Sequence, residues 1–154
     1  MLLDDRLEFA DATALNTGGA GTYLIGDVID LKPSTTNNNT TVDLEGSDLY
    51  FVVQVDTAAT SGGSATGQFK LASDAQAAIA TDGSATEHIA SQAIAVASLT
   101  AGKLVFAGKL PSGSYERYLG VLQVTGTAAF TAGKINAFLT ADPALWRAYA
   151  DNVA

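Results

Sequence analysis

Short runs of alternating residues, separated by turn-forming stretches, constrain the fold of this chain more than any other feature. The clearest pair is Tyr118–Val124 and Lys134–Leu139, joined by a connector rich in Gly, Thr and Ala. Both faces of the first run are largely apolar, which is typical of a strand that is covered on both sides. A third run, Leu49–Val55, alternates in the same way, and we expect it at the centre of a sheet.

Other strands are expected from the same alternation between turn-forming stretches. They are Tyr23–Leu31 with a break or bulge at Gly26, Gln68–Leu71, a short strand near Ile89–Val96, and Lys103–Ala107. The stretch Asp74–Ala80 could form one or two helical turns instead. About seven or eight short strands without helix–strand alternation predict an all-β chain, an antiparallel β-sandwich of jelly-roll type.

The two ends of the chain are expected to differ in structure from the β domain between them. Residues 1–21 are expected to form an N-terminal arm, which packs on its own sheet or reaches a neighbouring subunit. Residues 22–140 form the β domain. In the tail, residues 141–154, Asp142 and Pro143 suit the start of a short C-terminal helix. Because such a short helix is not stable alone, it must dock on its own domain or on a neighbouring chain.

Composition limits the class of protein. A chain of 154 residues with 47% hydrophobic and 16% charged residues fits one ordered domain. The net charge of −8 and the scattered basic residues argue against binding to nucleic acid or to an anionic membrane. The chain has no Cys, and we see no secretory signal and no membrane-spanning run, so a product of a cytoplasm is expected.

Nothing in the sequence has the pattern of a catalytic or cofactor site. His88 is the sole His, which together with the lack of Cys gives no zinc-ligand spacing, and we expect an ordinary surface His. The carboxylate pairs Asp4/Asp5, Asp27/Asp30 and Asp43/Glu45 look like solvated charges. We therefore expect no cofactor, no metal and no enzymatic activity.

Several motifs, taken in their order along the chain, resemble the capsid cement (decoration) proteins of short-tailed bacteriophages. The resemblance covers roughly residues 22–140. It rests on Val28–Leu31, on Leu49–Val55 with the Thr/Ala/Gly-rich connector that follows, on Ile94–Gly102, on Leu110-Pro111, on Arg117–Gly120 and on Phe130–Lys134. The Asn-rich loop Lys32–Asp48 and the stretch after Asp142 depart from this pattern.

The resemblance implies a structural virion protein. Such a protein is a jelly-roll homotrimer made in the bacterial cytoplasm, and it binds the major capsid protein on the outside of the icosahedral head. It would sit at threefold and quasi-threefold positions and stabilise the capsid against the pressure of packed DNA. A carbohydrate- or receptor-binding jelly-roll module on the phage head is the alternative, and a hydrolase is the third hypothesis.

We also predict core and contact residues. Phe51, Val53, Tyr118, Leu122 and Phe138 are expected in the core. Apolar and Arg residues on terminal arms need a partner surface, and Arg117 is a candidate for a buried or interfacial ion pair. The candidates for contact with the capsid or a sister subunit are Leu3, Arg6, Phe9, Arg117, Trp146, Arg147 and Tyr149.

Overall fold

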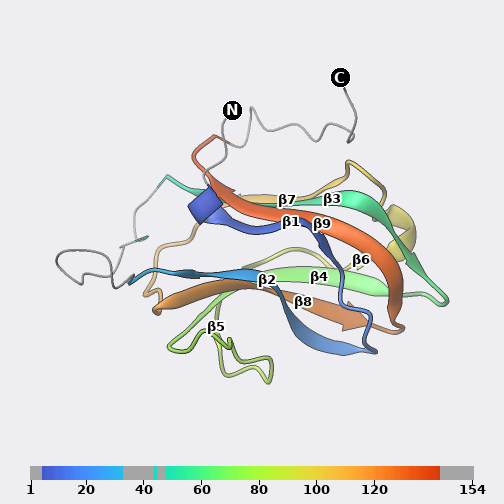
Figure 1. Ribbon diagram of the computed structural model, residues 1–154, viewed down its shortest axis with the longest axis horizontal. Helices are drawn as coiled ribbons and strands as arrows, with labels where there is room; N and C mark the ends of the chain where they lie inside the picture. Colours follow the sequence, from blue (N-terminus) through green and yellow to red (C-terminus); the bar gives the residue numbers. More distant parts are fainter. Residues whose placement is uncertain (1–4, 33–43, 45–47, 143–154) are drawn as a thin grey trace.

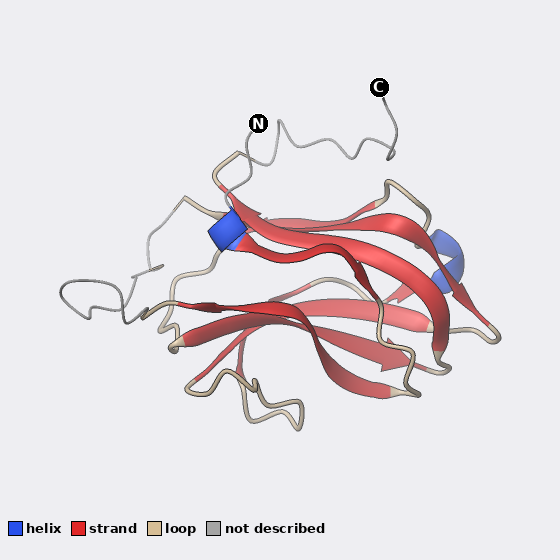
Figure 2. Cartoon of the chain, viewed as in Figure 1, coloured by secondary structure: helices blue, strands red, loops and turns tan. Residues whose placement is uncertain are grey.

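A computed structural model describes residues 5–32, 44 and 48–142 of the chain. Strands and two short 3-10 turns make up the regular structure of these residues (Figure 2). None of the helical segments in this part of the chain is long and apolar enough to cross a membrane. The elements are η1 Asp5–Leu7, β1 Glu8–Ala14, β2 Gly21–Asp30, β3 Tyr50–Ser61, β4 Thr66–Asp74, β5 Thr86–Ala90, β6 Ile94–Ala95, η2 Val96–Ser98, β7 Leu104–Lys109, β8 Tyr118–Gly126 and β9 Phe130–Thr140.

The strands form two antiparallel sheets that pack face to face as a sandwich (Figure 1). Sheet A has the order β1-β9-β3-β7, and sheet B has the order β2-β8-β4-β5, with the short β6 paired to β4. The predicted all-β sandwich is therefore confirmed. The expected C-terminal helix lies outside the described residues.

The core lies between the sheets because alternate residues of the central strands point inward. On β3 these are Phe51, Val53 and Val55, and on β8 they include Leu119 and Val121, none of them more than 2% exposed. The predictions that Phe51 and Val53 are core residues and that Leu49–Val55 is central are confirmed, since β3 lies between β9 and β7.

A second, smaller cluster lies on the outer face of sheet B. Leu122 of β8 packs there with Ala72 of β4, and the loop after β4 covers them with Ile79 and Ala85. This cover explains why both faces of β8 are apolar, as the sequence predicted. The helical turns considered for Asp74–Ala80 do not form. Ile79 instead anchors the loop, and the Asp74 carboxylate accepts the Ala80 N–H at 3.0 Å.

Gly26 brings the two sheets together along one side of the sandwich. Its φ of +71° is left-handed, and a side chain here would collide with the backbone carbonyl of Phe9 in β1. The pairing of β2 with β8 shifts register between Ile25 and Ile29, which confirms the predicted bulge. The bulge lets β2, in sheet B, approach β1, in sheet A.

Candidate functional site

The loops gather at two ends of the sandwich (Figure 1). The two ends differ in charge. We call one of them the charged end; it is formed by the described residues between β2 and β3 (31–32, 44 and 48–49) and by loops 75–85 and 110–117, with the adjoining strand ends. The opposite end, which we call the uncharged end, consists of loops 15–20, 62–65, 96–103 and 127–129. Its loop residues are mostly Gly, Ala, Ser and Thr, and Lys103 is the one charged residue among them.

An ion pair at the charged end joins the last residue of β2 to the loop before β8. The Arg117 guanidinium donates from Nε to Asp30 Oδ1 at 3.0 Å and from its terminal nitrogen to Asp30 Oδ2 at 2.9 Å. The Leu31 N–H donates to the Arg117 carbonyl at 2.8 Å, and the guanidinium lies 4.8 Å from the centre of the Tyr118 ring. The hydrogen bonds from Arg117 hold the pKa of Asp30 below its usual value.

The structure tests two predictions at this end, one for Arg117 and one for Tyr118. Arg117 was a candidate for a buried or interfacial pair, and the structure places it in a pair within the chain, with its side chain 44% exposed. Tyr118, expected in the core, is half-buried instead. The reason is that Tyr118 shares the outer face of β8 with Leu122, opposite the core residues Leu119 and Val121. The partial exposure leaves the outer side of the guanidinium open to solvent.

A polar cluster around His88 holds the loop 110–117 against sheet B. The Ser73 hydroxyl and His88 Nε2 are 2.7 Å apart, and the Glu116 N–H donates to the same hydroxyl oxygen at 3.1 Å. The His88 ring stacks on Tyr115 at 4.0 Å, and the Tyr115 hydroxyl donates to the Pro111 carbonyl at 2.6 Å. Burial lowers the pKa of His88, which favours the neutral ring.

The His88 cluster is better suited to holding the loop than to chemistry. Ser73 is fully buried, so a substrate cannot reach its hydroxyl. The oxygen of that hydroxyl accepts the Glu116 N–H, and the same hydroxyl shares a hydrogen bond with His88 Nε2. The sequence predicted an ordinary surface His here. It gave no sign of the cluster, because Ser73, His88 and Tyr115 come from three separate stretches of the chain.

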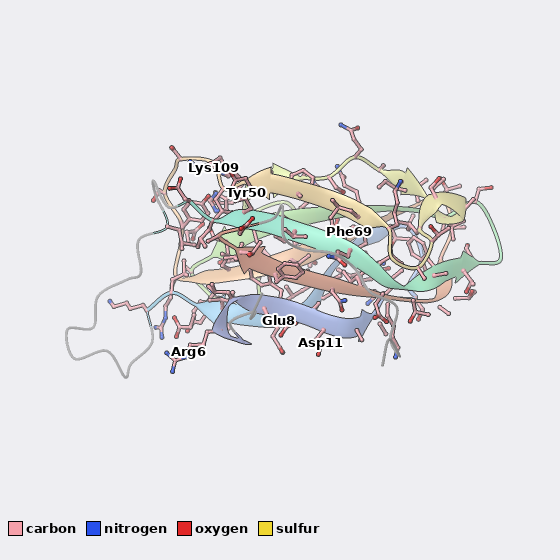
Figure 3. All side chains as sticks on the ribbon, turned by 90° about the horizontal axis from the view of Figure 1, so that it is seen from above. Arg6, Glu8, Asp11, Tyr50, Phe69 and Lys109 are labelled. Atoms are coloured by element: carbon pink, nitrogen blue, oxygen red, sulfur yellow. The ribbon has the colours of Figure 1, made fainter. Side chains whose placement is uncertain are left out.

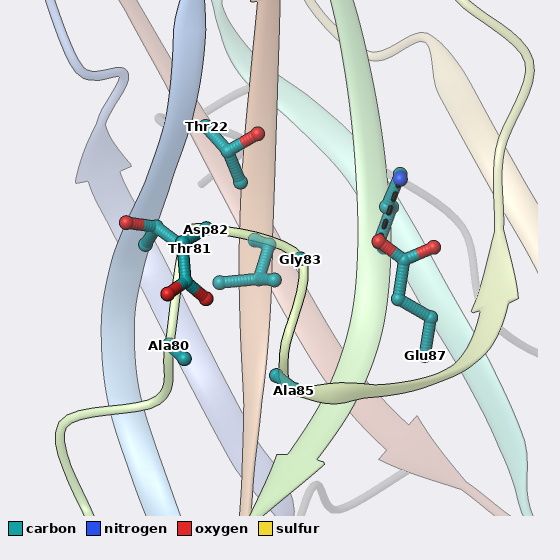
Figure 4. A pocket seen from close by; sticks show the side chains of 9 residues that line it. Thr22, Ala80, Thr81, Asp82, Gly83, Ala85 and Glu87 are labelled. Atoms are coloured by element: carbon teal, nitrogen blue, oxygen red, sulfur yellow. Dashed lines mark hydrogen bonds and ion pairs between the residues drawn. The ribbon is translucent and has the colours of Figure 1, made fainter.

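A small hollow lies on the outer face of sheet B, beside the loop 75–85 (Figure 4). Its volume of about 230 Å³ is below the roughly 300–1,000 Å³ of typical ligand pockets. Lys70 and Glu87 form an ion pair of 2.7 Å along one side of it. Its lining contains no aromatic side chain: Thr22, Lys70, Ala80, Thr81, Asp82, Gly83, Ala85, Glu87 and Leu122.

The structure describes only some of the remaining predicted contact residues. Phe9 is 1% exposed and packs edge-on against Phe51 at 6.1 Å, so its side chain belongs to this chain's own core and is not available for contact. Arg6 is exposed on η1. Of the two placements considered for the N-terminal arm, residues 8–14 take the first, as β1 in the chain's own sheet. Leu3, Trp146, Arg147 and Tyr149 lie outside the described residues.

No group of metal-ligating side chains stands out among the described residues. Among the described residues, no three His, Asp or Glu side chains are grouped to hold a metal ion. The features that the structure does bring together are the ion pair at Arg117, the cluster at His88 and the hollow on sheet B. The first two fix loops at the charged end of the sandwich.

Comparison with known protein families gives a match over most of the chain. The sequence matches the family described as Bbp16 over residues 9–139. The matched residues run from β1 to the end of β9 and so include both sheets of the sandwich. No curated protein matches the sequence.

Proposed function

We propose that this chain, which belongs to the Bbp16 family, is a structural protein of a phage particle. In this proposal it is a cement or decoration protein that binds the outside of the icosahedral head, contacts the major capsid protein and strengthens the shell. The family name suggests a phage-related protein, and the motif resemblance to capsid cement proteins supports the more specific role.

The observation that carries the proposal is the strand order of the two sheets. The resemblance implies a jelly roll, in which the chain passes back and forth between two four-stranded sheets and the first strand lies beside the last. The order β1-β9-β3-β7 facing β2-β8-β4-β5 agrees with that expectation. The connections from β1 to β2, β3 to β4 and β8 to β9 each pass from one sheet to the other.

Two of the motifs that carry the resemblance contact each other. Asp30, in Val28–Leu31, forms the ion pair with Arg117, in Arg117–Gly120, and it is also opposite Tyr118 in the β2–β8 register. The motif Leu110-Pro111 is tied in through the Leu110 N–H, which donates to the Leu49 carbonyl at 2.9 Å. These motifs therefore define the fold and its charged end, which supports a shared architecture.

The physical properties of the chain fit a role on the outside of a head. A net charge of −8 disfavours contact with packed DNA. If three copies associate, as the resemblance implies, three modest contacts in one rigid body give avidity well beyond that of each contact alone. The symmetry of such a trimer would match the threefold positions of the capsid.

Binding to heads tests the proposal. Purified protein is mixed with heads of the encoding phage that were assembled without it, and the heads are pelleted and then heated. The proposal expects saturable binding and release of DNA at a higher temperature than from bare heads. Heads that already carry the protein are the control, since their sites are occupied. A protein that stays in the supernatant at every concentration would contradict the proposal.

The oligomeric state is tested separately. Sedimentation equilibrium over a wide concentration range should give three times the chain mass of 15.7 kDa if the trimer forms before docking. A monomer at every concentration would leave trimer formation to the capsid surface. A stable dimer would contradict the threefold part of the proposal while leaving head binding open to its own test.

Carbohydrate binding is the weaker alternative. The hollow on sheet B is polar but lacks the aromatic side chain on which a sugar ring commonly stacks. A glycan array decides between the two functions, because retention of specific glycans, together with failure to bind heads, would favour the alternative.

A further inference from the structure

The outer face of sheet A carries an apolar patch at its centre. We call it the outer patch and define it by three cross-strand pairs of β3 and β9: Tyr50 with Thr140, Val52 with Phe138, and Gln54 with Asn136. These residues alternate with neighbours that point into the core between the sheets. The outer patch therefore faces away from sheet B.

The outer patch is buried although it faces outward. The exposed fraction is 0% for Phe138, 1% for Val52, 2% for Gln54 and 5% for Thr140. The outer face of an antiparallel sheet in a two-layer sandwich is normally in contact with water. Side chains on an uncovered sheet face would not reach values this low, so something must lie over the patch.

The described elements do not supply that cover. The patch lies on the face of sheet A seen in Figure 3, toward the end of β3 at which Tyr50 is labelled, with Lys109 and Glu8 at its borders. Across β7, the residue opposite Val52 is Ala107, which is too small to shield it. Among the described helices and strands, η1 borders β9, and none spans the centre of the patch (Figure 1).

The chain leaves β9 on the side of this face. Thr140 ends β9 and its side chain belongs to the outer patch. The Asp142 N–H donates to the Thr140 hydroxyl oxygen at 3.3 Å, so the backbone after β9 turns toward the patch. The patch extends along β3 from Tyr50 to Gln54, which is roughly 13 Å at the rise of a strand. Residues 143–154 would span ~18 Å as a helix and more if extended, and they begin beside it.

We propose that residues 143–154 of the same chain dock on the outer patch as a third layer of the sandwich. This segment offers Leu145, Trp146 and Tyr149, whose apolar surface matches Val52 and Phe138. It lies beyond the family match, which ends at residue 139.

Trp146 provides the test, because it is the sole Trp of the chain. In the folded full-length protein, the Trp emission should be blue-shifted, and quenching by acrylamide should be several-fold weaker than for free tryptophanamide. These values should not change on dilution. A solvated emission spectrum with full quenching in the folded protein would overturn the proposal.

Two variants sharpen the test. Val52→Asp should make Trp146 more quenchable, whereas Leu104→Asp is the matched control, because Leu104 is 52% exposed in the same sheet. If Val52→Asp fails to fold, a chain ending at Asp142 replaces it, with a lower urea midpoint and stronger binding of a hydrophobic dye expected. An unchanged midpoint and unchanged dye binding in the shortened chain would contradict the proposal.

Other occupants give different results. If the segment of a sister subunit covers the patch, Trp146 becomes quenchable on dilution as the sedimented mass falls. If residues 1–4 cover it, their removal exposes the patch to dye while Trp146 is fully quenchable from the start. Either result would overturn docking within one chain. The fluorescence readout does not depend on head binding, so this proposal and the proposed function can fail independently.

Discussion

At the uncharged end, backbone hydrogen bonds and the uncharged side chain of Gln123 hold the loops, whereas at the charged end an ion pair and a half-buried His add to the backbone hydrogen bonds. The Leu15 N–H binds the Gly133 carbonyl, and the Ala59 N–H binds the Leu99 carbonyl, each at 2.9 Å. At the charged end, the ion pair of Arg117 with Asp30 and the His88 cluster also hold the loops in place. Backbone bonds depend little on salt or pH, while ion pairs and a half-buried His depend on both.

One sandwich can thus have one end of fixed geometry and one end whose loops respond to salt and pH. Small side chains also let another backbone approach the uncharged end closely. On a capsid surface, the charged end would be the part whose contacts weaken with salt or acid.

Gln123→Leu should cause the largest loss of stability. Gln123 is fully buried, its Oε1 accepts the Asn16 N–H at 2.9 Å, and its Nε2 donates to the Asn16 carbonyl at 3.1 Å and to the Thr125 hydroxyl at 2.8 Å. A side chain of similar size that leaves these groups unpaired should cost about 1–3 kcal/mol of unfolding free energy. Urea denaturation measures it, with the exposed Gln92→Leu as the control. The loss should be the same at about 1 M NaCl, because salt does not screen hydrogen bonds between uncharged groups. A loss that disappears in salt would contradict this account of the uncharged end.

Arg117→Gln should cause a smaller loss that disappears in salt. The pair with Asp30 is partly exposed, so screening at about 1 M NaCl should remove most of its contribution. Lys103→Gln makes the same change of charge at the uncharged end and should leave the midpoint unchanged. Urea midpoints at low and high salt test both variants. An equal loss from the two, or a loss at Arg117 that salt does not alter, would show that general charge balance and not the pair is responsible.

Acid should weaken the charged end through His88. Because burial lowers the pKa of His88 below 6.5, the unfolded chain binds the proton more readily than the folded chain. The contribution of His88 is therefore complete above the unfolded pKa and is lost as the pH falls from 6.5 through the lower folded pKa. Urea midpoints between about pH 7.5 and 5 should fall in the native protein and stay flatter in His88→Gln.

A second pH window lies lower and serves as the internal control for the first. The pKa of Asp30 is lowered from 3.8 by its hydrogen bond from Arg117, so its contribution is lost only as the pH falls below that value toward the folded pKa. His88→Gln should leave this acid window intact. If the native protein and His88→Gln have the same slope in the higher window, the role given to the His88 cluster is wrong.

Lys109→Gln should have the smallest effect, with no measurable change of midpoint. Lys109 pairs with Asp48 at 2.8 Å, but the two side chains are 54% and 88% exposed. Fully exposed pairs of long side chains contribute little because water and salt screen them. A loss comparable to that of Arg117→Gln would mean that exposure does not separate the two pairs.

The fold was predictable where alternation is strong and less so where distant residues decide. Strands such as β3 and β8 show in the sequence, because their buried positions recur every second residue. The strand β1 is poorer in apolar residues, and its irregular backbone is held by Asn136, which accepts the Ala12 N–H at 2.6 Å across 124 residues of sequence. Ile79 was equally hard to place from the sequence, because its packing with Leu122 on the outer face of sheet B overrides a local helical tendency.

The candidate site was predictable only in part. Arg117 stood out because it precedes a strong strand and needs a partner, and Asp30 is that partner. The His88 cluster could not be predicted, because it depends on Ser73 and Tyr115 meeting His88 across the β4–β5 pairing and the loop 110–117. Phe9 was placed at a contact surface, since an isolated Phe on an arm does not reveal that the arm closes the core.

The most direct test of the proposed function is a cryo-EM map of phage heads with the protein bound. Heads assembled without the protein are imaged before and after its addition. The proposal predicts added density of sandwich shape on the outer surface at threefold and quasi-threefold positions, with occupancy that follows the amount added. Maps that are identical before and after addition, or density found only inside the shell or at the tail, would contradict it.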